Sequence, residues 1–191
     1  YINPIAGTFK LSDKPENNKE LSKNLLADKK ENSEHTMLVD LARNDLGKSN
    51  DNIKVVNYKE IKHFSHVMHI VSTVSGEIKP NADTSQIIAD SFPAGTLTGA
   101  PKHRAMQLIN EYENENRDYY GGCIGFINAN GLSNHAIMIR SFMSKNNKIH
   151  FKAGAGIVYD SDPEKERKEV ANKLAAIREA IKIAESNINN F

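Results

Sequence analysis

Residues 122–143, with the sequence GCIGFINANGLSNHAIMIRSFM, decide which fold class we expect. Apolar residues dominate from Gly122 to Ala129 and again from Ala136 to Met143, and each run has the length of a strand. Between the two runs, Asn128-Ala-Asn-Gly131 offers residues that readily form a tight turn. The middle of the chain therefore predicts an antiparallel hairpin.

The segments on either side of this hairpin alternate irregularly between expected strands and helices. Upstream, apolar residues recur at helical spacing from Glu31 to Leu46, and β-branched residues are frequent from Ile53 to Ile78. Residues 93–101 are rich in Gly, Pro and Thr and indicate a loop, whose last residue, Pro101, fits the first turn of a helix. Ser161 to Pro163 precede a long final helix. This order predicts an α+β fold with largely antiparallel sheets and flanking helices, rather than a doubly wound one.

Length and charge narrow the class of protein. A chain of 191 residues fits one domain over residues 1–191. The 25 Lys and Arg residues stand against 24 Asp and Glu residues, which argues against charge-driven binding to nucleic acid or to a membrane surface. Residues 13–32 are rich in Lys, Glu and Asn, and we expect a flexible charged segment there.

Cysteine content and hydropathy point to the compartment. Cys123 is the single cysteine, so no disulfide can form within the chain and thiolates cannot build a metal site. The apolar stretches are too short for a transmembrane helix, and the first residues lack the pattern of a signal peptide. We therefore expect a cytoplasmic protein.

Carboxylates stand at unusual positions on the first and last expected helices. In the last helix, Glu166, Glu169 and Lys173 fall within or beside the apolar arc. In the first helix, Glu31 and Glu34 share a face with apolar residues. Burying carboxylates without a counter-charge is costly, and oxygen ligands alone suit a hard cation such as Mg²⁺. The alternative is that these glutamates pair with Lys173 or flank the edge of the core.

Three other features suggest recognition of an anion. The backbone amides of Gly154-Ala155-Gly156 could surround a carboxylate, and Arg140 alternates with apolar residues in an expected strand, where it could pair with one. His69 is the best candidate for a histidine that acts on a substrate, although it could equally be a hydrogen-bonded core residue. His63, His66 and His69 cannot share one face of a strand, so we expect no zinc site there.

Seven longer stretches follow one another in an order that is typical of one enzyme family. They are Pro4 to Thr8, Glu34 to Asp45, Val67 to His69, Pro93 to Lys102, Tyr120 to Gly122, Ile139-Arg140 and Ala153 to Pro163. In these stretches the chain resembles the chorismate-utilising enzymes, and most of all anthranilate synthase component I. The resemblance runs to about Ile181 and implies the chorismate-binding α/β sandwich and a Mg²⁺-dependent attack on chorismate.

The resemblance also implies a role for each candidate residue. Glu34 and Glu169 match the metal ligands of the family, and Glu31 and Glu166 match nearby partners that often act through water. The ring carboxylate of chorismate would be held by Gly7, Thr8, the amides of Gly154, Ala155 and Gly156, and Lys173. The enolpyruvyl carboxylate would be held by Tyr120 and Arg140. His69 matches the histidine near the departing C4 hydroxyl, and Thr96 matches a residue that lines the same pocket. Together with Lys173 they are the expected catalytic residues.

The implied reaction adds ammonia at C2 of chorismate, removes the C4 hydroxyl and eliminates pyruvate to give anthranilate, a step of tryptophan biosynthesis. Ala6 stands where aminodeoxychorismate synthases typically carry a nucleophilic lysine. Gly99 to Lys102 reads as in the subtypes that use an amine. Both observations favour an anthranilate synthase, whose ammonia usually comes from glutamine through an amidotransferase partner.

The chain is short for this family. The chorismate-binding domain of the family is larger, and a Ser-Pro-Glu motif with an acidic catalytic residue lies upstream of the stretch that begins at Tyr1. We expect a domain truncated at its N-terminus. The alternatives are an inactive module that binds chorismate and Mg²⁺, or part of an aminodeoxychorismate or isochorismate-type synthase.

Overall fold

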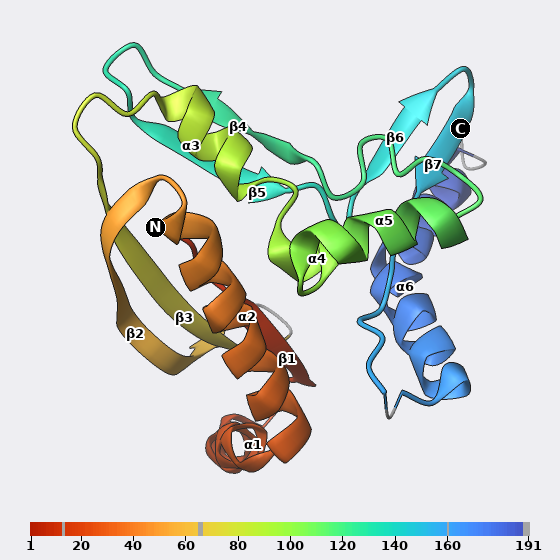
Figure 1. Cartoon of the computed structure of the whole chain (residues 1–191). Coiled ribbons are helices and arrows are strands. Elements are labelled where there is room, and N and C mark those ends of the chain that lie inside the picture. Colours follow the sequence, from red (N-terminus) through yellow and green to blue (C-terminus); the bar gives the residue numbers. More distant parts are fainter. Residues whose placement is uncertain (13, 65–66, 160, 189–191) are drawn as a thin grey trace. The chain divides into compact units, whose positions relative to one another are not determined.

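Residues 1–12, 14–64, 67–159 and 161–188 are described by the computed structural model of the chain (Figure 1). The chain divides into two units, Tyr1–Ala100 and Pro101–Phe191, and each is described by itself. In both units the sheets are antiparallel and helices accompany them, which confirms the predicted α+β class. The expectation of one domain stays a prediction.

A three-stranded sheet forms the centre of the first unit. It consists of β1 (Ile5–Lys10), β2 (Asn50–His63) and β3 (Val67–Ile78) in the order β1-β3-β2. Alternate residues of the central strand β3 are completely buried: Met68, Ile70, Ser72 and Val74. Because alternate side chains of a strand point to one face, this face of the sheet must be fully covered.

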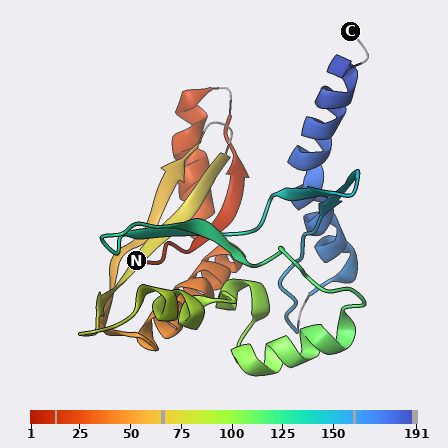
Figure 2. The same cartoon turned by 90° about the horizontal axis from the view of Figure 1, so that it is seen from above.

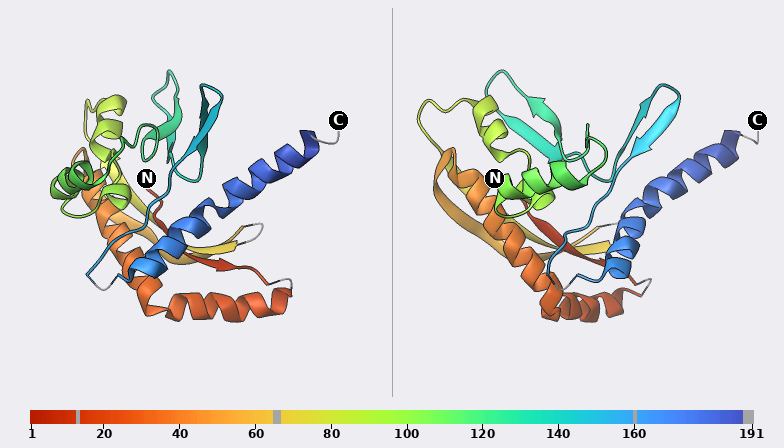
Figure 3. Two further views of the ribbon diagram at one scale, coloured as in Figure 1. Left: turned by 90° about the vertical axis from the view of Figure 1, so that its right-hand side faces the viewer. Right: turned by 45° about the vertical axis from the view of Figure 1, so that its right-hand side comes forward.

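Two helices cover that face, α1 (Pro15–Ala27) and α2 (Lys29–Gly47). Leu25 of α1 packs on Met68 and Ile70, while Val39 and Ala42 of α2 pack with Val74. Each large apolar side chain buried in this way stabilises the fold by about 1.5–3 kcal/mol. The two helices meet at a steep angle (Figure 3), and α2 confirms the helix predicted for residues 31–46.

The described part of segment 13–32 is mostly helical. Residues 15–27 form α1, and Asp28 then caps α2 by accepting a hydrogen bond from the amide of Glu31 at 3.0 Å. The single residue Asp28 thus separates two helices, where the sequence predicts a charged connection. The burial of Leu25 explains the difference, since it anchors an otherwise polar helix. The flexibility of the segment stays a prediction.

Two short helices complete the first unit. They are α3 (Thr84–Ser91), which the sequence analysis did not predict, and α4 (Gly95–Thr98), a single turn inside the expected loop 93–101. The side chain of Asp83 caps α3 by accepting from the amide of Ser85 at 3.2 Å.

The second unit contains the predicted hairpin. Its strands are β4 (Cys123–Ile127) and β5 (Ser133–Ile137), which pair from Cys123 with Ile137 to Ile127 with Ser133. A second hairpin follows, with β6 (Phe142–Lys145) and β7 (Lys148–Phe151). Helix α5 (Lys102–Tyr112) precedes both hairpins, and α6 (Pro163–Ile188) is the long final helix that the sequence predicts (Figure 2).

The prediction of one continuous strand from Ala136 to Met143 is wrong, because β5 ends at Ile137 and β6 begins at Phe142. The amide of Ile139 donates to the carbonyl of Ile137 at 2.9 Å, which closes a tight turn over Met138. Arg140 then adopts a φ of 54°, in the left-handed region. The turn and the left-handed residue end the strand although the apolar pattern continues.

No helix in the described ranges is both long and apolar enough to cross a membrane. Cys123 is a free, exposed cysteine.

A buried polar contact joins α2 to the sheet. The Nε2 atom of His35 lies 2.6 Å from Oγ of Ser72, and both side chains are completely buried. The same Oγ accepts a hydrogen bond from the amide of Lys59 at 2.9 Å, where β2 bulges away from β3. Burial, with a smaller contribution from the charge of Lys59, lowers the pKa of His35 from 6.5 to about 4. The folded state therefore favours the neutral ring.

We expect the free energy of unfolding to fall as the pH drops from 6.5 towards 4. In this window the unfolded state binds a proton at His35 and the folded state does not, so stability is present above pH 6.5 and is lost below it. The loss reaches at most about 3 kcal/mol. Urea unfolding at a series of pH values measures it.

The matched variant is His35→Gln, which keeps a polar side chain that does not titrate. Its stability should be lower than that of the natural chain near neutral pH and should change less between the two pKa values. An equally steep decline in His35→Gln would show that other groups cause the acid sensitivity.

Candidate functional site

Helix α2 carries the two candidate metal ligands of the first unit at its N-terminal end. Glu31 is half-buried, and its Oε2 lies 3.2 Å from the place where a Cβ on Gly7 would stand. Glu34 lies on the same side as the buried Leu38 and Leu41, but its side chain is exposed. Glu34 thus lies on the face that the sequence predicts but is not buried there, whereas Glu31 is buried in part.

Gly7 brings the backbone of β1 close to both α1 and α2. It is buried and has a φ of 65°, which favours glycine. A Cβ at this position would lie 2.9 Å from Cδ1 of Leu25, so even alanine would collide. For the neighbouring Thr8 the structure describes only the backbone, in β1, and its predicted contact with a carboxylate lies outside what is described.

His69 of β3 is held against this glycine. Its Nδ1 lies 2.7 Å from the carbonyl oxygen of Gly7. A carbonyl oxygen can only accept a hydrogen bond, so Nδ1 carries the proton and Nε2 has the lone pair in the neutral ring. The ring of Phe64 meets the half-buried histidine edge-on, with centroids 5.4 Å apart. His69 thus has a fixed orientation and a defined tautomer, which a residue that moves a proton needs.

Thr96 is exposed and belongs to the short helix α4. The amides of Leu97 and Gly99 donate to the carbonyls of Ala94 and Gly95 at 2.9 and 2.8 Å. These bonds hold the turn that carries Thr96.

Lys173 is the centre of the candidate site in the second unit. Its Nζ lies 2.6 Å from Oε1 of Glu169, one helical turn earlier in α6, and donates to the carbonyl of Gly154 at 2.9 Å. Both charged side chains are partly exposed, so water weakens their attraction. The alternative weighed from the sequence, a glutamate neutralised by Lys173, therefore describes Glu169. Half-buried Glu166 accepts a hydrogen bond from Oγ of Ser161 at 3.0 Å.

Tyr120 connects to the same turn. A Cβ on Gly154 would lie 3.3 Å from the Tyr120 hydroxyl oxygen, which is also hydrogen-bonded to the backbone of Gly154. Burial raises the pKa of Tyr120, so the hydroxyl keeps its proton and can donate it. Neighbouring Ala155 is half-buried and Gly156 exposed. Whether the amides of this turn bind a carboxylate stays a prediction.

Arg117 is a residue that the sequence analysis missed. Its guanidinium lies 5.7 Å from the centroid of the Tyr120 ring and forms hydrogen bonds to both carboxylate oxygens of Glu113, the shortest at 2.6 Å. The spacing of four residues between Glu113 and Arg117 is the signal that could have indicated the pair. Arg117 places a fixed positive charge beside the tyrosine.

Arg140 differs from its prediction. It is exposed and lies outside any strand, so its expected place in a buried apolar strand is wrong. Burial raises the pKa of Tyr120, and the charge of Arg140 opposes this rise as the smallest of its causes. An exposed guanidinium can bind an anion that reaches it from solvent.

The four candidate metal ligands are therefore described as two pairs, Glu31 with Glu34 in the first unit and Glu166 with Glu169 in the second. Within the described ranges, no group of three or more His, Cys, Asp or Glu side chains could by itself hold a metal ion. The donors are all carboxylates, and this chemistry fits Mg²⁺, which needs only one or two carboxylates and takes its other ligands from water and substrate.

Comparison with known proteins places these residues in a family. The family model described as chorismate binding enzyme matches residues 1–179. Anthranilate synthase component 1 of Aquifex aeolicus (strain VF5) is 49% identical over 186 residues, which is 96% of this chain and 38% of the relative. The protein of the same name from Bacillus subtilis (strain 168) is 47% identical over 96% of this chain and 36% of its own length.

Solved structures agree. Anthranilate synthase component I from Streptococcus pneumoniae TIGR4 superposes with a TM-score of 0.80 at 43% identity, covering 90% of this chain and 38% of that one. The menaquinone-specific isochorismate synthase MenF from Escherichia coli has a TM-score of 0.81 at 27% identity, covering 92% of this chain and 40% of that one. The chain thus spans well under half the length of these relatives, and it belongs to the family of chorismate binding enzymes.

Proposed function

We propose that this chain is part of an enzyme that converts chorismate and ammonia to anthranilate, pyruvate and water with the help of Mg²⁺. The observation that carries the proposal is the connected set formed by Glu169, Lys173, Gly154 and Tyr120, which joins a carboxylate, a cation and a hydroxyl donor. The similarity to anthranilate synthase component 1 over 96% of the chain supports the choice of reaction.

Binding of the substrate follows from the donors that these residues offer. The ammonium group of Lys173 has three N–H donors, and Glu169 and Gly154 receive two of them. The third can reach the ring carboxylate of chorismate, together with the amides of residues 154–156. Tyr120, whose hydroxyl stays protonated, and Arg140 can hold the enolpyruvyl carboxylate. Two separate carboxylate contacts fix the orientation of the ring.

The chemistry at the ring needs a proton transfer and a withdrawal of charge. With Nδ1 donating to the carbonyl of Gly7, Nε2 of the neutral His69 ring is a proton acceptor. Once Nε2 has taken a proton from solvent, the imidazolium can pass it to the departing C4 hydroxyl, which leaves as water. Thr96 lines the same pocket. Mg²⁺, held by Glu34 and Glu169 with Glu31 and Glu166 beside them, would draw negative charge from the ring carboxylate. Ammonia adds at C2, and loss of pyruvate restores the aromatic ring.

Ala6 bears on the choice among related reactions. It is buried, and its side chain packs with Leu38 and Leu41. A methyl group cannot act as the nucleophile that a lysine at this position would supply, so the geometry disfavours the aminodeoxychorismate reaction. We propose tryptophan biosynthesis in the cytoplasm as the setting, and a glutamine amidotransferase as the source of ammonia.

A second candidate is an isochorismate-type reaction, in which water replaces ammonia. The resemblance to MenF, with a TM-score of 0.81, favours it, but the identity of 27% is far below the 43% to the anthranilate synthase structure. A third is a module that binds chorismate and Mg²⁺ without turnover. Calorimetry with the 191-residue chain separates this module from an enzyme, because binding without turnover supports the module.

We expect Glu34→Ala and Glu169→Ala each to reduce formation of anthranilate by roughly 100-fold, because each removes a proposed oxygen ligand of Mg²⁺. The assay uses the longest polypeptide that the gene encodes, with chorismate, ammonium and Mg²⁺, and follows anthranilate by its fluorescence and mass. Chelation of the metal should abolish the product, and added Mg²⁺ should restore it.

Glu164→Ala is the matched control on α6, since Glu164 is exposed and pairs only with nearby Arg167 at 2.9 Å among the contacts described. It should retain nearly full activity. Product of the mass of isochorismate, formed without ammonium, would favour the second candidate. Equal rates in the natural protein and both glutamate variants would contradict the proposed metal site.

We expect Lys173→Ala to raise the KM for chorismate by roughly tenfold or more, because a hydrogen bond to a charged group contributes about 1.5–3 kcal/mol. Steady-state kinetics at saturating Mg²⁺ measures this effect. Lys168→Ala, which removes an exposed lysine of the same helix, is the control and should leave KM unchanged. An unchanged KM in Lys173→Ala would exclude Lys173 from the carboxylate site.

A further inference from the structure

A carboxylate near the end of α2 is buried, although no role has been given to it. Asp45 is only 4% exposed. Its Oδ2 accepts a hydrogen bond from the amide of Gly95 at 3.0 Å, across 50 positions of sequence. Gly95 is the first residue of α4, the turn that carries Thr96. Asp45 therefore joins α2 directly to the backbone beside a proposed catalytic residue.

The backbone of Gly95 lies close to side chains of α2. A Cβ on Gly95 would lie 3.1 Å from Cδ2 of Leu41 and 3.3 Å from Oδ2 of Asp45. Gly95 is itself buried, so its amide is shielded from water and needs an acceptor within the protein. The turn is thus held from two directions, by an apolar contact with Leu41 and by the carboxylate.

Asp45 is a charged acceptor for the amide of Gly95. The ammonium group of Lys48, whose side chain is 43% exposed, lies 3.8 Å from its Oδ1. A charged acceptor makes a stronger hydrogen bond to an amide than a neutral one. The buried carboxylate of Asp45 therefore holds the turn more firmly than a neutral acceptor would.

We propose that Asp45 is a positioning residue, which fixes residues 93–98 on α2 so that Thr96 keeps a constant place relative to Glu34 on the same helix. The consequence of the contact between Asp45 and Gly95 for catalysis rests on the proposed function. The contact itself does not, because it lies entirely within the first unit. Thr96 is exposed and its turn is a single helical turn long, so the contact of Gly95 with α2 ties this short turn to a long helix.

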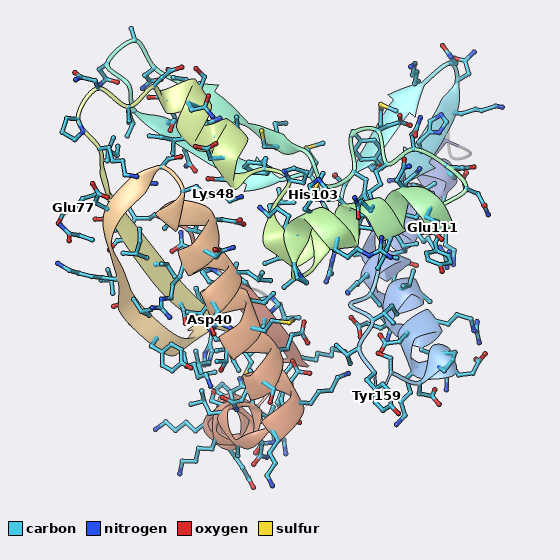
Figure 4. All side chains as sticks on the ribbon, in the orientation of Figure 1. Asp40, Lys48, Glu77, His103, Glu111 and Tyr159 are labelled. Atoms are coloured by element: carbon cyan, nitrogen blue, oxygen red, sulfur yellow. The ribbon has the colours of Figure 1, made fainter. Side chains whose placement is uncertain are left out.

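Hydrogen exchange tests the contact independently of activity. In Asp45→Ala, amide exchange in the segment 93–101 should accelerate at least tenfold, while β3 exchanges as before. The matched control is Asp40→Ala on the same helix, where Asp40 is exposed and pairs with Arg43 at 3.1 Å (Figure 4). This variant should leave the segment unchanged. Unchanged exchange in Asp45→Ala, or equal acceleration in both variants, would overturn the proposal.

Kinetics of the longest polypeptide that the gene encodes tests the role in positioning. Asp45→Ala should lower kcat for anthranilate formation by 10- to 100-fold and change the KM for chorismate by less than threefold, because the proposed carboxylate contacts lie on other elements. Asp45→Asn keeps an oxygen acceptor for the amide of Gly95 but loses the charge, so it should recover part of kcat and lie between Asp45→Ala and the natural protein. A loss shared equally between kcat and KM, or no recovery in Asp45→Asn, would indicate a merely structural residue and refute positioning.

Gly95→Ala provides a second approach should Asp45→Ala fail to fold. The added methyl group pushes Leu41 and Asp45 away from the turn, so the variant should show the same fall in kcat and the same local exchange. A Gly95→Ala variant with natural kcat would count against the proposal. If the natural protein forms no anthranilate, the proposed function fails, and the exchange experiment still decides whether Asp45 holds the turn.

Discussion

The buried face of strand β3 is the constraint on which the first unit depends. Met68, Ile70, Ser72 and Val74 are completely buried, and α1 and α2 must lie over them. Apolar packing alone would allow α2 to rotate or slide slightly. The contact between His35 and Ser72 at 2.6 Å restricts this freedom, because a misplaced helix would leave buried polar groups without partners. The position of α2 then determines where its carboxylates emerge.

In the second unit, polar and charged contacts hold the elements of the candidate site together. Its two hairpins leave apolar side chains such as Ile124 and Phe126 more than half exposed, so packing contributes less there. Lys173 links α6 to the turn at Gly154, and Tyr120 contacts that turn from the segment before β4. Partly exposed polar contacts of this kind are weaker than a packed core, but they bring together the groups proposed to bind carboxylates.

Much of this architecture could be predicted from the sequence. The helical spacing of residues 31–46 and the turn at 128–131 depend on local interactions, and both elements are present. Other features depend on distant partners. The helix at 15–27 is polar and is anchored by Leu25 against β3. Arg140 lies outside any strand, after a turn that the apolar pattern does not indicate. The pairing of Asp45 with Gly95 spans 50 positions, so no periodicity could indicate it.

Two glycines show how the proposed site depends on close approach of backbone to α2. Gly7 lies beside Glu31 near the start of the helix, and Gly95 lies beside Leu41 and Asp45 towards its end. At either position a single methyl group would fill the space between the elements. Each glycine also determines the place of a neighbour, since Gly7 accepts from His69 and Gly95 precedes Thr96. Helix α2 therefore carries Glu34 and holds the turn of Thr96, and a shift of this helix would disturb both together. His69 is positioned by β1 through the carbonyl of Gly7, which lies between α1 and the side chain of Glu31.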